Sequence, residues 1–484
     1  MDKLQLIPYP NEVRMLPGSI PLSKIGRRSF FSTIDRNTGN PESYYLSISE
    51  NGVKIVAGGE AGRYYAAQTL KQISETYPDR LPFLEIRDKP AFPYRGFMLD
   101  SVRHMTPIED IKKLIDAAAL LKLNKFHWHL TDDQGWRIEI DSYPLLNEVA
   151  SYRNGSHFGK VHDDRIYGGY YTKREMREIA DYCADRHIDV IPEIDMPGHM
   201  VAAIAAYPEI SCRGEEIPVE TRQGIFPDIL CAGNPKTLQM IFDILDEVIR
   251  IFPCKYIHIG GDEAPKKRWK ECRHCQELIR ELGLETEEEL QGWFMNRVAE
   301  FLQSRGRKAI TWNESLNSGL LNKDIIVQMW MDRKKLSVDF ANSGGNIIVS
   351  PFYHYYLDYP YGMTPLNKTY KFDPILKGLD NQGAGNVAGV ETPVWTEHIR
   401  DFNQLCFMAF PRAAAVAEAG WTFEENRDVD DFNVRLQALT PRLRSLGIKP
   451  APEKDWNPNP FRRLIQTIRF FLSITTKEMI KGYD

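Results

Sequence analysis

From Arg95 onward, short runs of β-forming residues alternate with helical stretches about eight times. The β-like runs are residues 95–102, 125–132, 188–195, 256–262, 308–313, 325–330, 346–352 and 387–395. Among the helical stretches, residues 106–123 start with Thr106-Pro107, a capping residue followed by proline, and carry apolar residues at helical spacing. Because strand–helix alternation implies parallel strands, eight such units favour an α/β fold with a closed (β/α)₈ barrel, the TIM barrel.

An open, doubly wound sheet is the main alternative to the barrel. Such a fold would place a glycine-rich phosphate-binding loop after its first strand. Residues 100–104 (DSVRH), where the first predicted strand of this region runs out, contain no glycine. We therefore predict a barrel over residues 93–421.

Two further regions flank the predicted barrel. Residues 1–92 carry strand-like runs at 43–49 and 53–57 and a helical stretch at 61–75, which together predict a small α+β domain. Residues 422–484 read as a proline-rich linker followed by a helix with apolar side chains on one side and arginines nearby. We expect this helix to dock on the barrel; a helix lying on a membrane surface is the alternative.

The composition excludes several classes of protein. Lysine and arginine total 61 against 66 aspartates and glutamates, a net charge of −5, and no basic block suggests nucleic-acid binding. No apolar run reaches the ~18 residues that a membrane span needs. The chain as given starts without a signal peptide, so we expect a periplasmic or secreted protein if a leader was removed and a cytoplasmic one otherwise. The oligomeric state stays open.

The ends of the predicted strands are unusually polar and aromatic. Active sites of (β/α)₈ barrels gather at the carboxyl ends of the strands. The residues at these ends are Asp100, Asp132, Asp133, Asp195, His199, Asp262, Glu263, Trp312, Glu314, Trp330, Tyr356, Asp358, Trp395 and Glu397. A single acidic residue there can simply cap the next helix, but this reading does not explain the whole set. Carboxylates beside aromatic faces suit a neutral, hydroxyl-rich ligand, so the sequence predicts a glycosidase.

Asp262 and Glu263 are neighbours in the sequence, which limits what they can do together. A glycosidase with two acting carboxyls holds them on opposite sides of the sugar, about 5–5.5 Å apart when it retains configuration and about 6.5–9.5 Å when it inverts. Adjacent residues at one strand end approach from the same side. One of them can act as the acid while the other orients the substrate, which fits a sugar that carries its own nucleophile, such as a 2-acetamido group.

Several long motifs resemble one enzyme family. Residues 257–265 (IHIGGDEAP) resemble the catalytic motif of glycoside hydrolase family 20, the β-N-acetylhexosaminidases. Further motifs of the same family are resembled by residues 94–105, 124–140, 192–200, 355–359 and 394–398. Residues 6–13 and 61–73 resemble the family's small accessory domain. The resemblance implies exo-acting, retaining removal of terminal non-reducing β-linked N-acetylhexosamine from a glycan. The sugar would be GlcNAc, with GalNAc or 6-sulfated GlcNAc as further options, and the resemblance implies no cofactor and no metal.

The same resemblance implies substrate-assisted catalysis through an oxazolinium ion. Glu263 would protonate the glycosidic oxygen and later activate water. Asp262 would hold the acetamido N–H, and Tyr356 would donate to the acetamido oxygen.

Further residues would contact or support the sugar. By the resemblance, Arg95 would bind the 3- and 4-hydroxyls, and Asp358 and Glu397 would bind the 4- and 6-hydroxyls. Trp312, Trp330 and Trp395 would form an aromatic wall around the sugar. Asp132 and His199 would lie near Glu263 and tune its acidity, with Asp195 behind them. Family members often carry a tryptophan shortly after the segment at 355–359, and residues 359–374 contain none. The linkage preference therefore stays open.

Histidines and cysteines suggest alternatives. His127 and His129 share one strand face, as a metal-ligating pair does, which would fit a metal-dependent barrel hydrolase. A catalytically inactive sugar-binding protein on the same barrel is the other alternative. Cys272-x-x-Cys275 has the spacing of half a zinc site, but the sequence has no second such motif, so we expect structural thiols. His354 and His398 could meet a 6-sulfate or be exposed loop histidines.

Overall fold

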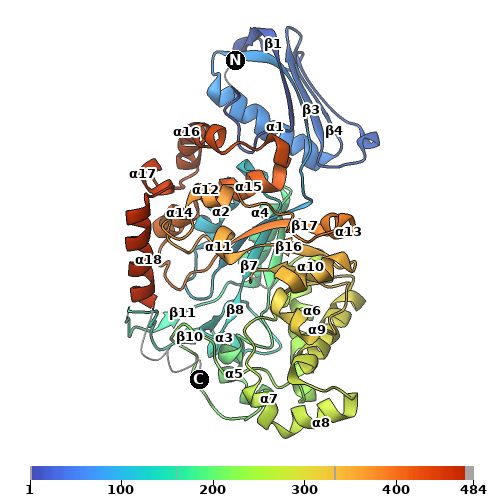
Figure 1. Cartoon of the computed structure of the whole chain (residues 1–484), viewed down its shortest axis with the longest axis vertical. Coiled ribbons are helices and arrows are strands. Elements are labelled where there is room, and N and C mark those ends of the chain that lie inside the picture. Colours follow the sequence, from blue (N-terminus) through green and yellow to red (C-terminus); the bar gives the residue numbers. More distant parts are fainter. Residues whose placement is uncertain (1–2, 161, 332–333, 475–484) are drawn as a thin grey trace.

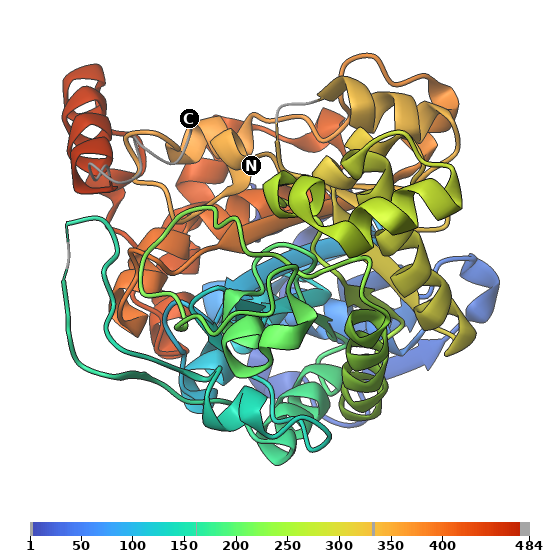
Figure 2. The same ribbon diagram turned by 90° about the horizontal axis from the view of Figure 1, so that it is seen from below.

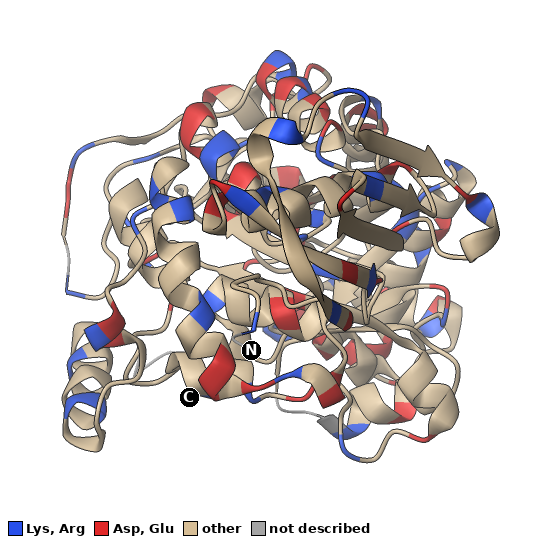
Figure 3. Cartoon of the chain, turned by 90° about the horizontal axis from the view of Figure 1, so that it is seen from above, with Lys and Arg blue, Asp and Glu red and all other residues tan. Residues whose placement is uncertain are grey.

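The computed structural model describes residues 3–160, 162–331 and 334–474. A small sheet domain lies at one end, a barrel forms the middle, and a C-terminal helix runs along one side (Figure 1). Acidic and basic residues are interspersed over the view in Figure 3, in keeping with the net charge of −5. Within the described ranges, no helix is long and apolar enough to cross a membrane.

Eight parallel strands close into a barrel, which confirms the predicted fold class. The strands are β6 (Tyr94–Asp100), β7 (Lys125–His129), β12 (Asp189–Glu193), β13 (Tyr256–His258), β14 (Lys308–Trp312), β15 (Ile326–Met329), β16 (Ile347–Val349) and β17 (Val387–Val394). Pairing of β17 with β6 closes the ring. All eight coincide with the predicted runs, because strands buried on both faces read as short apolar segments between helices.

Helices connect the strands and cover the barrel. The main ones are α2 (Ile108–Leu120), α4 (Lys173–Ala184), α6 (Pro235–Ile251), α9 (Glu287–Ser304), α10 (Lys334–Asn342), α14 (Phe402–Ala409) and α15 (Arg412–Trp421). The loops carry α3 (Leu145–Glu148), α5 (Val201–Ala206), α7 (Lys267–Glu271), α8 (Arg273–Leu282), α11 (Phe352–Tyr355), α12 (Leu366–Tyr370), α13 (Asn381–Gly385), β8 (Thr131–Asp132), β9 (Gly135–Trp136), β10 (Tyr152–Arg153) and β11 (Tyr167–Gly168). Local signals set the ends: Thr172 and Glu175 form a reciprocal capping box before α4.

The small domain is a five-stranded sheet with one long helix. Its elements are β1 (Glu12–Pro21), β2 (Phe30–Ile34), β3 (Tyr44–Ser49), β4 (Gly52–Ala57), α1 (Glu60–Thr76) and β5 (Arg80–Asp88), and the sheet order is β1-β5-β3-β4-β2. The two predicted strands correspond to β3 and β4. The other three were missed because Pro17, Gly18 and Pro82 interrupt β1 and β5, and β2 is an exposed edge strand without alternation.

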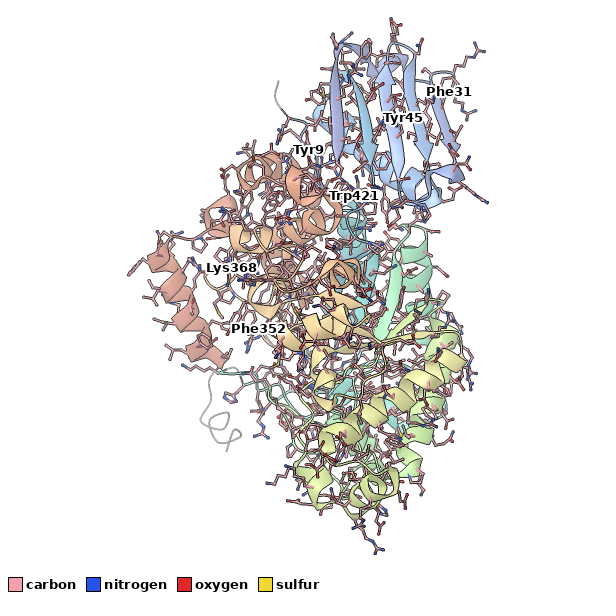
Figure 4. All side chains as sticks on the ribbon, turned by 45° about the vertical axis from the view of Figure 1, so that its right-hand side comes forward. Tyr9, Phe31, Tyr45, Phe352, Lys368 and Trp421 are labelled. Carbon is pink, nitrogen blue, oxygen red and sulfur yellow. The ribbon has the colours of Figure 1, made fainter. Side chains whose placement is uncertain are left out.

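The region after the barrel joins the two domains. Helix α16 (Val429–Ser445) and helix α17 (Glu453–Trp456) follow α15, and Arg435 of α16 forms a buried ion pair with Glu418 at 2.7 Å. Tyr9 and Trp421 lie in the same junction (Figure 4). The indole N–H of Trp421 donates to Asp88 Oδ2 at 2.9 Å, which ties the end of α15 to the small sheet.

Helix α18 (Pro460–Ile474) stands at the margin of the barrel, as Figure 2 shows. Its Phe470 ring packs against the rings of Tyr359 and His398, with centroids 5.5 and 5.8 Å apart. The helix therefore docks on the barrel through one face. Its solvent-exposed apolar side chains are Phe461, Leu464, Ile468, Phe471 and Leu472.

Candidate active site

The loops after β7, β12 and β13 form the end of the barrel that faces away from the small domain. They carry β8, α5, α7 and α8, which lie at that end in Figure 1. The predicted site residues other than Arg95 lie at or after the carboxyl ends of their strands. This is the end at which barrels of this class build their active sites.

A glycine turn and an unusual backbone conformation present Asp262 and Glu263 after β13. Gly260 has φ 65°, and a Cβ there would lie 1.6 Å from Asp195 Oδ1. Glu263 itself has φ 42°, and its N–H donates to Glu314 Oε2 at 2.5 Å. A positive φ costs a residue with a side chain about 1–3 kcal/mol. The surrounding structure therefore holds Glu263 against a backbone preference, which is typical of functional positions.

His199 connects the two acids to the interior of the barrel. Its Nε2 lies 3.8 Å from Asp262 Oδ2 and 3.5 Å from Glu263 Oε2. Its Nδ1 lies 3.1 Å from Asp132 Oδ1. Burial alone lowers the pKa of His199, but Asp132 and Asp195 hold it well above its ordinary value. The ring is therefore an imidazolium that places a positive charge between the two acids.

The side chain of Asp262 is largely buried and has other carboxyl groups as neighbours. Burial raises the pKa of Asp262 to about 7, Glu263 and Glu314 add to the shift, and His199 opposes it. Its Oδ1 is buried without a hydrogen-bond partner among the described residues. Buried polar atoms are almost always paired, so this oxygen is available to a donor on a bound ligand.

Asp132 and Asp195 contact the groups that position Asp262 and Glu263. Burial raises the pKa of Asp132, but the charge of Arg103 and hydrogen bonds from His129 and His199 bring it well below its ordinary value. Asp195 Oδ1 accepts from the N–H of Gly261 at 3.3 Å. Burial raises the pKa of Asp195 well above its ordinary value.

Four aromatic residues form a continuous wall beside the acids. The Tyr356 ring lies 6.2 Å from Trp330, nearly parallel to it, and 6.3 Å from Trp395. Trp395 is in turn 6.1 Å from Trp312, whose indole N–H donates to Glu193 at 2.8 Å. The indole N–H of Trp330 is buried and has no hydrogen-bond partner in the described part of the chain. The predicted aromatic residues are thus brought together.

Arg103 is a site residue that the sequence reasoning missed. Its guanidinium lies 2.8 Å from Asp132 Oδ2, 3.6 Å from Glu397 Oε1 and 5.3 Å from the centre of the Trp395 ring. Burial and the neighbouring Glu397 raise the pKa of Asp358 to about 8. Arg103, Asp358 and Glu397 thus form one cluster of hydrogen-bonding groups at the edge of the aromatic wall.

The expected sugar-binding role of Arg95 is wrong. Arg95 lies at the start of β6, about 16 Å from the carboxyl end of that strand at about 3.3 Å per residue. Its guanidinium bonds to Glu42 at 2.7 Å and to the Tyr65 hydroxyl at 3.3 Å. Because the strand runs from the small domain toward the site, its first arginine belongs to the domain junction.

Substitutions that disturb Arg103 and Arg95 are expected to affect different properties, the first catalysis and the second stability. Arg103→Lys should lower kcat/KM by at least about 30-fold, since truncating a buried charge pair costs about 2 kcal/mol or more. Glu42→Gln, which breaks the pair with Arg95, should leave kcat/KM unchanged but lower the free energy of unfolding by about 3 kcal/mol. Steady-state kinetics and denaturant unfolding measure the two effects. A large loss of kcat/KM in Glu42→Gln, together with an unchanged kcat/KM in Arg103→Lys, would instead indicate that Arg95 acts at the site.

His127 and His129 form part of a buried network below the site. His127 Nδ1 lies 2.7 Å from Glu391 and its Nε2 3.1 Å from Glu193. His129 bonds to Asp132 at 2.8 Å through Nε2 and to Glu193 through Nδ1. Although burial lowers it, the two glutamates raise the pKa of His127 to about 9. Both ring nitrogens of each histidine are already paired with buried carboxylates, so this geometry favours a structural hydrogen-bond network over the metal-dependent hydrolase.

His398 is not a loop histidine exposed to solvent. Burial, helped by His104, lowers the pKa of His398 to about 4, and Phe470 packs against its ring. The ring is therefore neutral near pH 7 and offers no positive charge to a sulfate. His354 packs against Phe372, with ring centroids 4.6 Å apart.

A cavity of about 660 Å³ opens beside Glu263. Ile225, Ala264, Lys266 and Glu314 are among the residues that line it. Most of its lining comes from the loop that follows β13, from α9 and from the segment that follows β14, and Ile225 is contributed by the excursion after β12. A large group attached to a bound sugar could occupy this space.

Comparison with known proteins gives a consistent result. Residues 92–424 match the profile of "Glycosyl hydrolase family 20, catalytic domain", and residues 25–89 match "Glycosyl hydrolase family 20, domain 2". The chain is 38% identical to a β-hexosaminidase of Porphyromonas gingivalis over 91% of its own length and 58% of that relative's length. It is also 38% identical to a β-hexosaminidase of Akkermansia muciniphila, over 82% of each chain.

Solved structures show the same architecture. The exo-β-N-acetylglucosaminidase of Vibrio harveyi, crystallised in complex with N-acetylglucosamine, aligns with a TM-score of 0.81 and 29% identity. The alignment covers 93% of this chain and 78% of that one.

Proposed function

The chain belongs to glycosyl hydrolase family 20, and from this premise we propose that it removes terminal, non-reducing β-linked N-acetylglucosamine from glycans with retention of configuration. The observation that carries the proposal is the arrangement of Asp262 and Glu263. They are adjacent, share the His199 imidazolium at 3.8 and 3.5 Å, and lie beside an aromatic wall. Two acids on one side of a sugar suit a reaction in which the substrate supplies the nucleophile.

The first step forms a ring within the substrate. Glu263 donates its proton to the glycosidic oxygen while the acetamido carbonyl oxygen attacks C1, and the bond from C1 to the leaving group breaks. Asp262 accepts the acetamido N–H and stabilises the positive charge of the oxazolinium ion. Tyr356 donates to the acetamido oxygen. Tethering the nucleophile to the reacting ring replaces a bimolecular encounter, which gives effective concentrations of about 10⁵–10⁸ M.

The second step opens that ring with water. The Glu263 carboxylate removes a proton from the water as the water attacks C1. The second attack on C1 restores the β configuration and the acetamido group. His199 keeps a positive charge near Glu263, and Asp132 and Asp195 hold that charge in place.

The cluster around Arg103 would select the sugar. Asp358 and Glu397 would accept hydrogen bonds from the 4- and 6-hydroxyls, and Arg103 would donate to a neighbouring hydroxyl. Trp312, Trp330 and Trp395 would enclose the acetamido group and the apolar face of the ring. GalNAc remains a second candidate substrate. A 6-sulfate is disfavoured, because it would approach two carboxyls and a neutral His398.

The pKa of Asp262 gives the reaction a defined pH dependence. Ionised Asp262 accepts the acetamido N–H, and in the free enzyme burial raises its pKa to about 7. We therefore expect kcat/KM to increase with pH through about 7, because this constant reports ionisations of the free enzyme. The acid limb of kcat should lie at lower pH, since the bound N–H stabilises the anion. Coincident acid limbs in full pH profiles would contradict this assignment.

Turnover and stereochemistry test the proposed activity. We expect release of p-nitrophenol from p-nitrophenyl N-acetyl-β-glucosaminide, with the β anomer of GlcNAc as first product in time-resolved proton NMR. The α-linked glycoside serves as the control and should not be hydrolysed. Tight binding of GlcNAc without turnover would support the inactive sugar-binding alternative instead.

A further inference from the structure

Four cysteines meet outside the proposed active site. Cys212 follows α5, and Cys231 precedes α6, both in the excursion after β12. Cys272 and Cys275 lie at the start of α8, in the excursion after β13, which is at the lower end of the barrel in Figure 1. Three of the four are buried, and Cys212 is partly exposed. The paired motif noted in the sequence is therefore completed by two cysteines from another loop.

The sulfur positions match a tetrahedron. Cys231 Sγ lies 3.7 Å from the sulfurs of both Cys272 and Cys275, and Cys212 Sγ lies 3.8 Å from Cys275 Sγ. All four sulfurs lie within 4.8 Å of one another. Tetrahedral zinc with Zn–S bonds of about 2.3 Å separates its sulfurs by about 3.8 Å. A disulfide would need about 2.05 Å, well below each of these separations.

We propose that Cys212, Cys231, Cys272 and Cys275 bind a structural zinc ion. Four thiolates complete the tetrahedral coordination of zinc and leave no position for water or substrate, so the site stabilises structure and takes no part in the chemistry. Soft sulfur ligands in this geometry select zinc over magnesium or calcium. The proposal concerns metal binding and stands whether or not the proposed hydrolase activity is correct.

The packing around the cluster indicates what the ion would hold together. A Cβ at Gly233 would lie 2.3 Å from the His274 carbonyl group, so the two cysteine-bearing segments are in backbone contact. The indole N–H of Trp269 donates to Leu230 O at 2.8 Å, next to Cys231. The ion would thus join the excursions after β12 and β13. These excursions contribute Ile225 and Ala264 to the cavity beside Glu263.

Metal analysis of the purified full-length chain tests the proposal. We expect about one zinc ion per chain by inductively coupled plasma mass spectrometry. A mercurial reagent, which modifies thiols, should release the zinc ion, and a metallochromic dye would detect the released zinc. Cys272→Ser and the milder Cys212→Ser, at the partly exposed ligand, should each lose most of the zinc. Cys254→Ser is the matched control: this buried thiol lies outside the cluster and donates to Tyr256 O at 2.9 Å, which a hydroxyl can also do.

A second measurement is independent of how the variants fold. Wild-type protein produced with Co²⁺ in place of zinc should show the intense visible absorption of tetrahedral cobalt thiolate and the matching sulfur-to-cobalt charge-transfer band. Protein without bound zinc, protein with iron instead, disulfides between these cysteines by mass spectrometry, or zinc retained in full by Cys272→Ser would each overturn the proposal.

Discussion

Glu263→Gln is expected to lower kcat/KM for β-linked chitobiose by about 10²–10⁴-fold, the usual share of general acid–base catalysis. Glutamine keeps the shape of the side chain but has no proton to give to the glycosidic oxygen. The loss should be much smaller with p-nitrophenyl N-acetyl-β-glucosaminide, because p-nitrophenolate leaves with little protonation. Steady-state kinetics on the two substrates measure this difference.

Glu271→Gln provides the matched control. Glu271 lines the cavity beside Glu263, but its carboxyl is exposed and pairs with Arg268 at 3.9 Å. This variant should match the wild type on both substrates. Equal losses on both substrates for Glu263→Gln would mean that Glu263 does not act as the acid.

Asp262→Asn is expected to lower kcat/KM by about 10²–10³-fold on both substrates, the effect typical of removing one preorganised electrostatic contact from a developing charge. Asparagine can still accept the acetamido N–H through its carbonyl, but it lacks the negative charge that stabilises the oxazolinium ion. Because this charge acts on the sugar and not on the leaving group, the loss should not depend on the leaving group.

The pH profile separates an electrostatic role of Asp262 from a structural one. The acid limb of kcat/KM near pH 7 should disappear in Asp262→Asn, because the group whose pKa burial raises to about 7 is gone. The thermal midpoint of the variant should stay near that of the wild type or above it, since a buried carboxyl is replaced by a neutral amide. A large fall in activity with an unchanged acid limb would assign the titration to another group.

The barrel could be predicted because its signal is local. Most of the strands are short apolar runs followed by a helical stretch, and this alternation recurs about eight times, although the spacing between the runs varies. The small domain was predicted less completely, because Pro17 and Pro82 lie inside β1 and β5, where pairing with neighbouring strands outweighs the local preference.

The site could be predicted where strand direction alone decides position. Residues that follow a strand, such as Glu263 and Trp395, lie at the carboxyl end of the barrel. Arg95 and Arg103 belong to one motif, but Arg95 lies at the start of β6 and Arg103 follows its end, so the two lie at opposite ends of the strand. The arginine that the family resemblance assigned to the sugar, Arg95, lies at the end of the strand away from the candidate site, whereas Arg103 lies at the end nearer to it.

Contacts between segments that are far apart along the chain could not be predicted from the sequence. Arg103 and Glu397 are 294 positions apart, and nothing local indicates that they meet. The same holds for Cys231 and Cys272, which are separated by 41 positions and lie in different loops. A search of the sequence for paired cysteine motifs finds one half of such a cluster, whereas the fold brings in the other half.

The central claim is that the substrate supplies the attacking oxygen, and one comparison tests it most directly. Hydrolysis of p-nitrophenyl N-acetyl-β-glucosaminide should be measured against p-nitrophenyl β-glucoside, which has a hydroxyl at C2. We expect kcat/KM for the glucoside to be lower by about 10⁵-fold or more, because the tethered nucleophile is absent. Comparable values for the two substrates would contradict the account.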